Sequence, residues 1–279
     1  MPHQKKFRLA FVGGAPNSAV GYAHFVATRM DGLWDLQAGA FSRHAEVNAK
    51  AAEIYGVPRE RSYGGLAELL DKEGDNLDAV SILTPTPDHF GMVLDCLQRG
   101  LPVICEKALA MTSGEATKIR DICSEKKGFL AVIYNYSGYP MVRELRKMIR
   151  DGVLGEILHF QVEMPQEGFL RVDDQGNKPV PQEWRKMDGR VPTLHLDLAV
   201  HLHELVTYCK WVGGDPSLKL RRHLTVASYN SDFLYLLIVT ILCYASVFFP
   251  CCMNSHTMQI DPRHLLTVNI FIPCEYTTH

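Results

Sequence analysis

The sequence predicts an α/β protein: a doubly wound parallel sheet, followed by an incomplete α+β domain. Three observations support this prediction. Short apolar runs alternate with segments whose apolar residues recur at helical spacing, a glycine-rich turn follows the first run, and no repeat or low-complexity segment interrupts the alternation. We expect the first domain to span residues 1–135.

The expected elements follow one another along this domain. Phe7 to Val12 is an apolar run typical of a buried strand, and residues 22–30 after the glycine turn repeat apolar positions at helical spacing. Val47 to Tyr55 is an expected helix rich in alanine. The other expected strands are Leu36 to Phe41, Leu77 to Leu83, residues 102–107 and residues 128–135.

Two helices carry recognisable start signals. Thr86 is the expected N-cap of one helix, with Pro87 at its first position and Gly100 at its end. Thr112 and Glu115 have the three-residue spacing of a capping box ahead of the next helix.

Composition excludes several classes of protein. The 279 residues are 47% hydrophobic and 22% charged, which is typical of a globular protein that buries a sizeable core. The net charge is −2 and the 29 basic residues are scattered, so we expect no nucleic-acid partner. The apolar run near the N-terminus is too short for a secretory signal, and the eight cysteines lack regular spacing, so we expect reduced thiols and a cytoplasmic location.

The glycine turn after the first strand predicts a phosphate-binding site. Gly13, Gly14 and Gly21, with Ser18 between them, precede a helix whose free N–H groups and dipole favour a pyrophosphate. The spacing differs from the common GxGxxG pattern, so a glycine turn without a ligand remains the alternative.

The end of the second strand predicts which dinucleotide binds. An acid at this position would bind the ribose hydroxyls of NAD, but Ser42 and Arg43 stand there, and they suit the 2′-phosphate of NADP. We therefore predict NADP, with NAD as the second choice because Glu46 lies close by.

A charge pair ends the fourth expected strand. Ligands of open parallel sheets bind beyond the carboxyl ends of the strands, which is where Glu106 and Lys107 lie. A lysine there can hydrogen-bond a substrate hydroxyl and stabilise its alkoxide character as hydride leaves. The alternative is a solvated loop lysine.

Three motifs in order resemble the glucose–fructose oxidoreductase/inositol dehydrogenase (Gfo/Idh/MocA) family. They are TPTPDH, CEKALA and NYSGYPMVRELRKMIRDGVLGEI, and the resemblance covers roughly residues 5–216. Lys107 matches the catalytic lysine of the family, while Ala108 stands where the family has proline.

The resemblance implies a Rossmann domain, an NAD(P)-dependent oxidoreductase activity on a sugar or polyol, and a substrate and oligomerisation domain starting at residue 136. The family's Asp-xxx-His pair matches Asp197 and His201, which share one helical face. His201 is then the base that takes the hydroxyl proton, and Asp197 orients the substrate and assists it. The matched motifs also imply cofactor contacts from Thr84, Pro85, His89 and Glu106, and a substrate contact from Tyr136.

Two further groups of residues were weighed. Trp184 and Arg185 offer a flat apolar surface and hydrogen bonds for a sugar ring, although a surface loop anchored by its tryptophan is the alternative. His195, His201, His203 and Glu204 follow neither the HExxH nor the zinc-finger spacing, so we expect no metal.

Two other functions remain open: a dinucleotide-binding regulator or scaffold without turnover, and an inactive truncated fragment of the enzyme. The trio Lys107, Asp197 and His201 favours the enzyme, since a regulator is free to lose it.

The segment 217–279 departs from the resemblance. Residues 233–249 carry no charge, and this run of 17 residues is near the lower length limit of a membrane span. Four of the eight cysteines follow residue 242. This segment could be a tail anchor, or a buried helix or strand pair. We favour a third interpretation, in which the segment is not the family's own sequence and results from a shifted reading frame, a retained intron or a mispredicted gene end. The sheet would then lack strands, the chain would be poorly soluble and nearly inactive, and the homo-oligomer expected of a complete sheet would not form.

Overall fold

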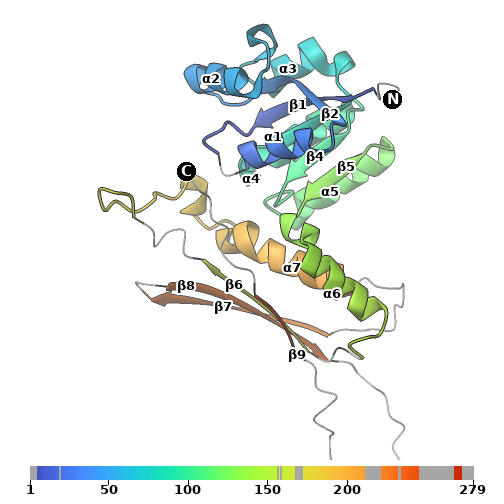
Figure 1. The fold of residues 1–279 in the computed structure, drawn as a ribbon, viewed down its shortest axis with the longest axis vertical. Helices are drawn as coiled ribbons and strands as arrows, with labels where there is room; N and C mark the ends of the chain where they lie inside the picture. The colour runs from blue at the N-terminus through green and yellow to red at the C-terminus, as the bar shows by residue number, and fades with distance from the viewer. Residues whose placement is uncertain are drawn as a thin grey trace, which may run out of the picture. The chain divides into compact units, whose positions relative to one another are not determined.

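The computed structural model describes residues 5–18, 20–155, 157, 159–166, 172–210, 221–231, 234–244 and 267–271. The chain divides into two compact units (Figure 1). The first unit is Met1–Ile133 with Asp188–Pro192, and the second is Tyr134–Met187 with Thr193–His279.

The first unit contains a five-stranded parallel sheet in the order β2-β1-β3-β4-β5. Its strands are β1 (Phe7–Gly13), β2 (Trp34–Ala40), β3 (Ala79–Leu83), β4 (Val103–Glu106) and β5 (Leu130–Ile133). Its α-helices are α1 (Gly21–Met30), α2 (Ala45–Tyr55), α3 (Leu66–Glu73), α4 (Thr86–Gln98) and α5 (Ser113–Glu125). The predicted doubly wound parallel sheet is confirmed. The strand order reverses at β1 and β3, where such folds bind their ligands.

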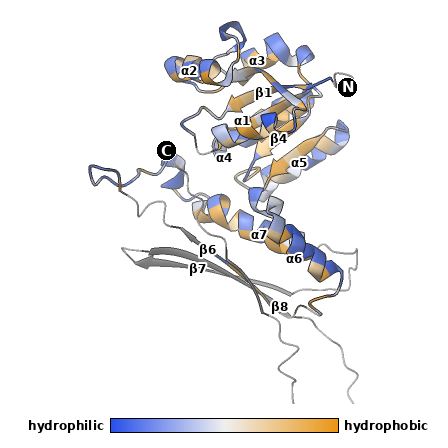
Figure 2. Ribbon diagram, in the orientation of Figure 1, coloured by the Kyte–Doolittle hydropathy of each residue, from blue (hydrophilic) through white to orange (hydrophobic). Residues whose placement is uncertain are grey.

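Alternate residues of β1 belong to two different cores, as the two-residue period of a strand requires. Leu9 and Phe11 pack with residues of α1 and α2, whereas Ala10 and Val12 pack with residues of α3, α4 and α5. Both faces of the sheet are therefore covered by helices, and Figure 2 shows the hydrophobic colour of β1 and β4 between them. A strand buried on both faces reads as a continuous apolar run, which is how β1 was recognised.

The predicted helix starts differ in accuracy. The capping box is confirmed: Thr112 Oγ1 accepts from the Glu115 N–H at 3.2 Å, and Glu115 Oε2 accepts from the Thr112 N–H at 3.2 Å. The predicted N-cap of α4 is wrong by one residue, because Thr86 already belongs to the helix and the extended Pro85 precedes it. The Thr86 side chain is buried and makes no capping bond.

The second unit packs helices against a four-stranded sheet in the order β7-β8-β6-β9. Its helices and turns are η3 (Asn135–Gly138), α6 (Pro140–Arg150), η4 (Glu183–Arg185), the π-helical turn η5 (His195–Ala199) and α7 (Val200–Lys210). Its strands are β6 (His159–Gln166), β7 (Arg221–Ser231), β8 (Leu234–Tyr244) and β9 (Thr267–Phe271). Leu202, Leu205 and Val206 of α7 share a core with Val142 of α6 and Val162 of β6.

Part of the segment after residue 216 lies in this sheet. β8 runs antiparallel to both β6 and β7, and β9 runs parallel to β6. This arrangement corresponds to the strand pair among the alternatives weighed from the sequence. Residues 217–220, 232–233, 245–266 and 272–279 lie outside the described residues, and a segment foreign to the family stays a prediction. None of the described helices has the length and hydropathy needed to cross a membrane.

Candidate functional site

The glycine turn brings the end of β1 very close to the start of α1. Gly13 and Gly14 have φ angles of 78° and 73°, which L side chains rarely adopt. A Cβ atom on Gly21 would lie 2.0 Å from the Gly14 carbonyl oxygen. Glycine at all three positions is therefore required by the turn itself, and the result is a helix N-terminus directly beyond the carboxyl end of β1.

Two polar side chains hold this turn. Ser18 Oγ accepts a hydrogen bond from the Gly21 N–H at 2.9 Å, and Tyr55 of α2 donates its hydroxyl proton to the Gly14 carbonyl at 2.7 Å. Burial raises the pKa of Tyr55 to about 12, so its hydroxyl remains a donor at neutral pH. The turn is fixed by residues of the chain alone, which is the preorganisation that anion binding at a helix N-terminus needs.

Ser42 and Arg43, the two residues predicted to favour NADP over NAD, follow the end of β2. Buried Asn48 organises the backbone here, because its Oδ1 accepts from the N–H groups of Phe41 at 2.8 Å and Ser42 at 3.2 Å. The Asn48 amide also donates to Ser62 Oγ and to the Tyr63 carbonyl, both at 3.0 Å.

Arg43 follows at the surface of this backbone. Its side chain is exposed, and within the described part of the chain no hydrogen bond or ion pair engages its guanidinium. The Arg43 guanidinium is an exposed fork of N–H donors just after a strand end, and such a fork is suited to a phosphate group.

The ends of β3 and β4 carry the remaining predicted cofactor residues. Thr84 and Pro85 connect β3 to α4, and Glu106 and Lys107 end β4. His89 is fully buried beneath them, with Nδ1 2.7 Å from the Ala108 carbonyl oxygen and Nε2 2.7 Å from the Thr84 carbonyl oxygen. Direct cofactor contact from His89 stays a prediction; the structure shows its ring joining two strand ends.

The Glu106 carboxylate is largely buried at the carboxyl end of β4. Its side chain is 11% exposed, Oε1 lies 2.8 Å from His24 Nε2, and Oε2 accepts the Lys107 N–H at 3.2 Å. Lys107 itself is half-buried.

The second unit carries Asp197 and His201. Asp197 lies in the π-helical turn η5, and its carboxylate faces the Arg185 guanidinium, with Nη2 3.1 Å from Oδ1 and Nε 2.9 Å from Oδ2. The Arg185 guanidinium carbon also lies 5.1 Å from the centre of the Trp184 ring. The structure thus links the two predicted substrate residues of η4 to Asp197.

His201 lies one turn further along, in α7, and is 7% exposed. Two tyrosines meet it edge-on: the Tyr136 ring centre lies 4.7 Å and the Tyr134 ring centre 6.1 Å from the imidazole centre. Tyr136 was predicted for the substrate and Tyr134 was not, although both belong to the same NYSGY motif.

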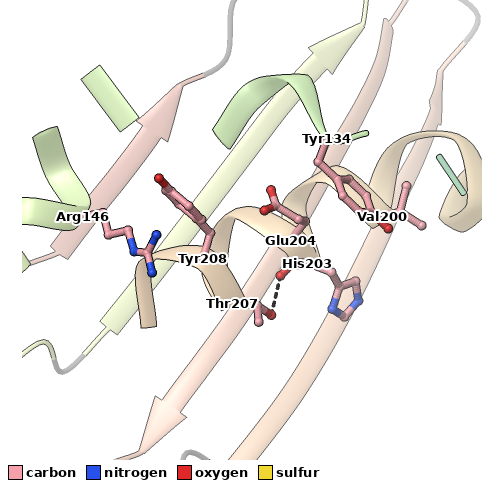
Figure 3. Close-up of a pocket in the computed structure, with 7 residues that line it drawn as sticks. All are labelled: Tyr134, Arg146, Val200, His203, Glu204, Thr207 and Tyr208. Atoms are coloured by element: carbon pink, nitrogen blue, oxygen red, sulfur yellow. Dashed lines mark hydrogen bonds between the residues drawn. The ribbon is translucent and has the colours of Figure 1, made fainter. Parts of the chain in front are cut away.

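Tyr134 also lines a hollow of about 470 Å³ (Figure 3). Its lining comes from Tyr134, α6 and α7: Tyr134, Arg146, Val200, His203, Glu204, Thr207 and Tyr208. Burial raises the pKa of Glu204, while a hydrogen bond with Ser137 and the charge of Arg146 oppose the rise. The Arg146 guanidinium lies 4.1 Å from the centre of the Tyr208 ring. The hollow therefore offers aromatic surface with a few polar groups, but its lining includes none of the predicted residues Trp184, Arg185, Asp197 and His201.

Sequence reasoning missed four residues that support these sites: His24, Asn48, Tyr55 and Tyr134. Each acts on a partner made adjacent by folding; His24 and Glu106, for example, are 82 residues apart. For Asn48, the available signal was a polar residue on the same helix face as Ala51 and Ala52. Among the described residues, no three His, Cys, Asp or Glu side chains group in a way that could hold a metal ion.

Comparisons with known proteins agree with this geometry. Residues 7–134 match the profile described as the oxidoreductase family with an NAD-binding Rossmann fold (GFO_IDH_MocA). The chain is 34% identical over 185 residues to YfiI, an uncharacterized oxidoreductase of Bacillus subtilis, and 28% identical over 164 residues to levoglucosan dehydrogenase of Pseudarthrobacter phenanthrenivorans. These stretches cover 65% and 58% of this chain but 47% and 40% of the relatives, so the chain spans less than half of their length.

A solved structure extends the likeness beyond the first unit. An inositol dehydrogenase homolog from Azotobacter vinelandii, determined with NADH and myo-inositol, aligns with a TM-score of 0.67 at 26% identity. The alignment covers 88% of this chain and 66% of that chain.

We expect Asn48→Ala to lower the free energy of unfolding by about 2–3 kcal/mol, since four hydrogen bonds are lost and buried N–H groups are left unsatisfied. Urea denaturation measures this change. Gln98→Ala, at an exposed amide of α4, is the matched control and should change the free energy by less than about 0.5 kcal/mol. Equal stability of the Asn48 variant and the control would contradict the role assigned to Asn48.

Proposed function

We propose that the chain is, through its first unit, a member of the Gfo/Idh/MocA family of oxidoreductases and that it is an NAD(P)-dependent dehydrogenase acting on CH–OH groups of a sugar, polyol or related compound. The observation that carries the proposal is the position of Lys107, at the carboxyl end of β4 and close in the strand order to the glycine turn of β1. Carbohydrate chemistry is supported by the relatives, which include levoglucosan and D-xylose dehydrogenases.

The residues at the carboxyl ends of the parallel strands fit a dinucleotide. The N-terminus of α1 and the turn of Gly13 and Gly14 suit the pyrophosphate, and Arg43 with Ser42 suits a ribose phosphate. When bound, the nicotinamide supplies the hydride acceptor or donor.

In this proposal each catalytic residue of the chain has one task. The Lys107 ammonium donates a hydrogen bond to the substrate oxygen and stabilises the negative charge that develops there. The His201 imidazole takes the hydroxyl proton, since imidazole exchanges protons near neutral pH. Asp197, held by Arg185, orients the substrate and assists His201. Tyr136, Trp184 and Arg185 complete the substrate side.

We further propose NADP as the preferred cofactor, with NAD second, and a cytoplasmic location; a homo-oligomer is proposed only for a chain whose C-terminal sheet is complete. The exposed guanidinium of Arg43 supports the first point. Cys96, Cys105, Cys123 and Cys209 are free thiols, which fits a reducing compartment.

Replacing the two proton-handling groups tests the mechanism. We expect Lys107→Ala and His201→Ala each to lower kcat by about 100-fold or more, because both groups act on charge that develops in the transition state. NADPH affinity should stay within about twofold. Turnover is followed by nicotinamide absorbance with a panel of sugars and polyols.

The control for this experiment is Lys118→Ala, at an exposed lysine of α5. Normal turnover in either site variant would refute the mechanism. NADPH binding without turnover of any substrate by the unmodified chain would contradict an active enzyme and favour the regulator or the inactive truncated fragment.

Arg43→Ala tests the cofactor choice. Loss of the guanidinium should weaken NADPH binding by about tenfold or more and leave NADH binding nearly unchanged, because only NADPH carries the 2′-phosphate. Fluorescence titration gives both dissociation constants. An unchanged NADPH/NADH affinity ratio would show that Arg43 does not bind the 2′-phosphate.

A further inference from the structure

Lys107 lies between two residues that are each held by a histidine. On one side, the Glu106 carboxylate lies 2.8 Å from Nε2 of His24, which belongs to α1. On the other side, the Ala108 carbonyl oxygen lies 2.7 Å from Nδ1 of His89, which belongs to α4. Neither histidine is a neighbour of Lys107 in the sequence.

The contacts from His24 lead directly to the backbone of Lys107. Both oxygens of Glu106 are engaged: Oε1 faces His24, and Oε2 accepts the Lys107 N–H. The His24 and Glu106 side chains are 16% and 11% exposed, so water competes little for this bond. A buried carboxylate needs such donors, because an unsatisfied charge in the interior is costly.

The contacts from His89 fix the other side of the same segment. The ring is fully buried and bridges two carbonyl oxygens, that of Ala108 after β4 and that of Thr84 after β3. Since a carbonyl oxygen only accepts, each bond requires a proton on the ring nitrogen that faces it. A neutral imidazole carries one such proton, so the ring donates to one of the two carbonyl oxygens and lies close to the other, between the two strand ends.

We propose that His24 and His89 are positioning residues that form a two-histidine brace around Lys107. The brace sets where the lysine stands at the end of β4 and connects it to the helix after the glycine turn, so the phosphate-binding element and the catalytic lysine move as one. Its catalytic consequence rests on the proposed function, whereas the brace itself is a property of the first unit alone.

The brace makes a prediction about local backbone stability. In His24→Phe, the amides of residues 103–112 should exchange hydrogen about tenfold faster or more, because Glu106 loses the donor that orients it. Amides of residues 45–55 in α2 should keep their exchange rates. His24→Asn, whose amide can donate to Glu106, should recover part of the protection. Hydrogen exchange with mass spectrometry on the full chain measures all three.

The catalytic consequence separates positioning from direct contact. His24→Phe should lower kcat by about tenfold with NADPH affinity within about twofold, because a small displacement of a catalytic group is costly. Glu106→Gln should lower kcat by about tenfold for the same reason. The double variant should be no slower than the slower single variant, since both changes break one contact. For the hydrogen-exchange measurement described above, the control variant is His44→Phe, at an exposed histidine of the same unit.

Nitrogen-15 spectra of the imidazoles in the unmodified chain test the His89 side without a variant. The brace predicts that the His89 ring proton is protected from exchange with solvent by its bond to a carbonyl oxygen; a ring proton in rapid exchange with solvent would overturn it. Unchanged exchange of residues 103–112 in His24→Phe would also overturn it, and so would additive losses in the double variant. If the chain binds no dinucleotide and turns over no substrate, the proposed function fails, while the exchange and imidazole measurements still decide the brace.

Discussion

The buried carboxylate of Glu106 joins the two parts of the first unit on which the proposed chemistry depends. Through His24 it meets the helix that begins at the glycine turn, and through the Lys107 N–H it meets the strand end that carries the lysine. A carboxylate is kept in so enclosed a place only where donors satisfy it. The close approach of Gly21 to the Gly14 carbonyl then sets where that helix begins.

Local patterns predicted much of the fold. The capping box of Thr112 and Glu115 could be predicted because it depends on residues three apart in the sequence. Strand β1 could be predicted because burial on both faces requires a continuous apolar run. The N-cap of α4 was misassigned because Thr86 and Pro85 both suit a helix start, and only the backbone angles distinguish them. The strand β8 had no such pattern, since a run without polar alternation fits a strand or a helix equally well.

The positions of some site residues followed from local patterns. Lys107 comes directly after β4, as its motif predicted, whereas the catalytic roles of Lys107, Asp197 and His201 stay predictions. Asn48, Tyr55 and His24 escaped notice because their partners lie far away along the chain or are backbone groups, which carry no sequence signal. These supporting residues are what convert a glycine turn and a lysine into a preorganised site.

Isotope transfer tests the central claim most directly. The chain is incubated with NADP⁺ or NAD⁺ and perdeuterated sugars or polyols, and deuterium in the reduced cofactor is measured by mass spectrometry. The account predicts one deuterium per reduced nicotinamide with at least one substrate of the panel, because the hydride comes directly from the substrate carbon. Cofactor that binds with full affinity but acquires no deuterium from any of them would contradict the account.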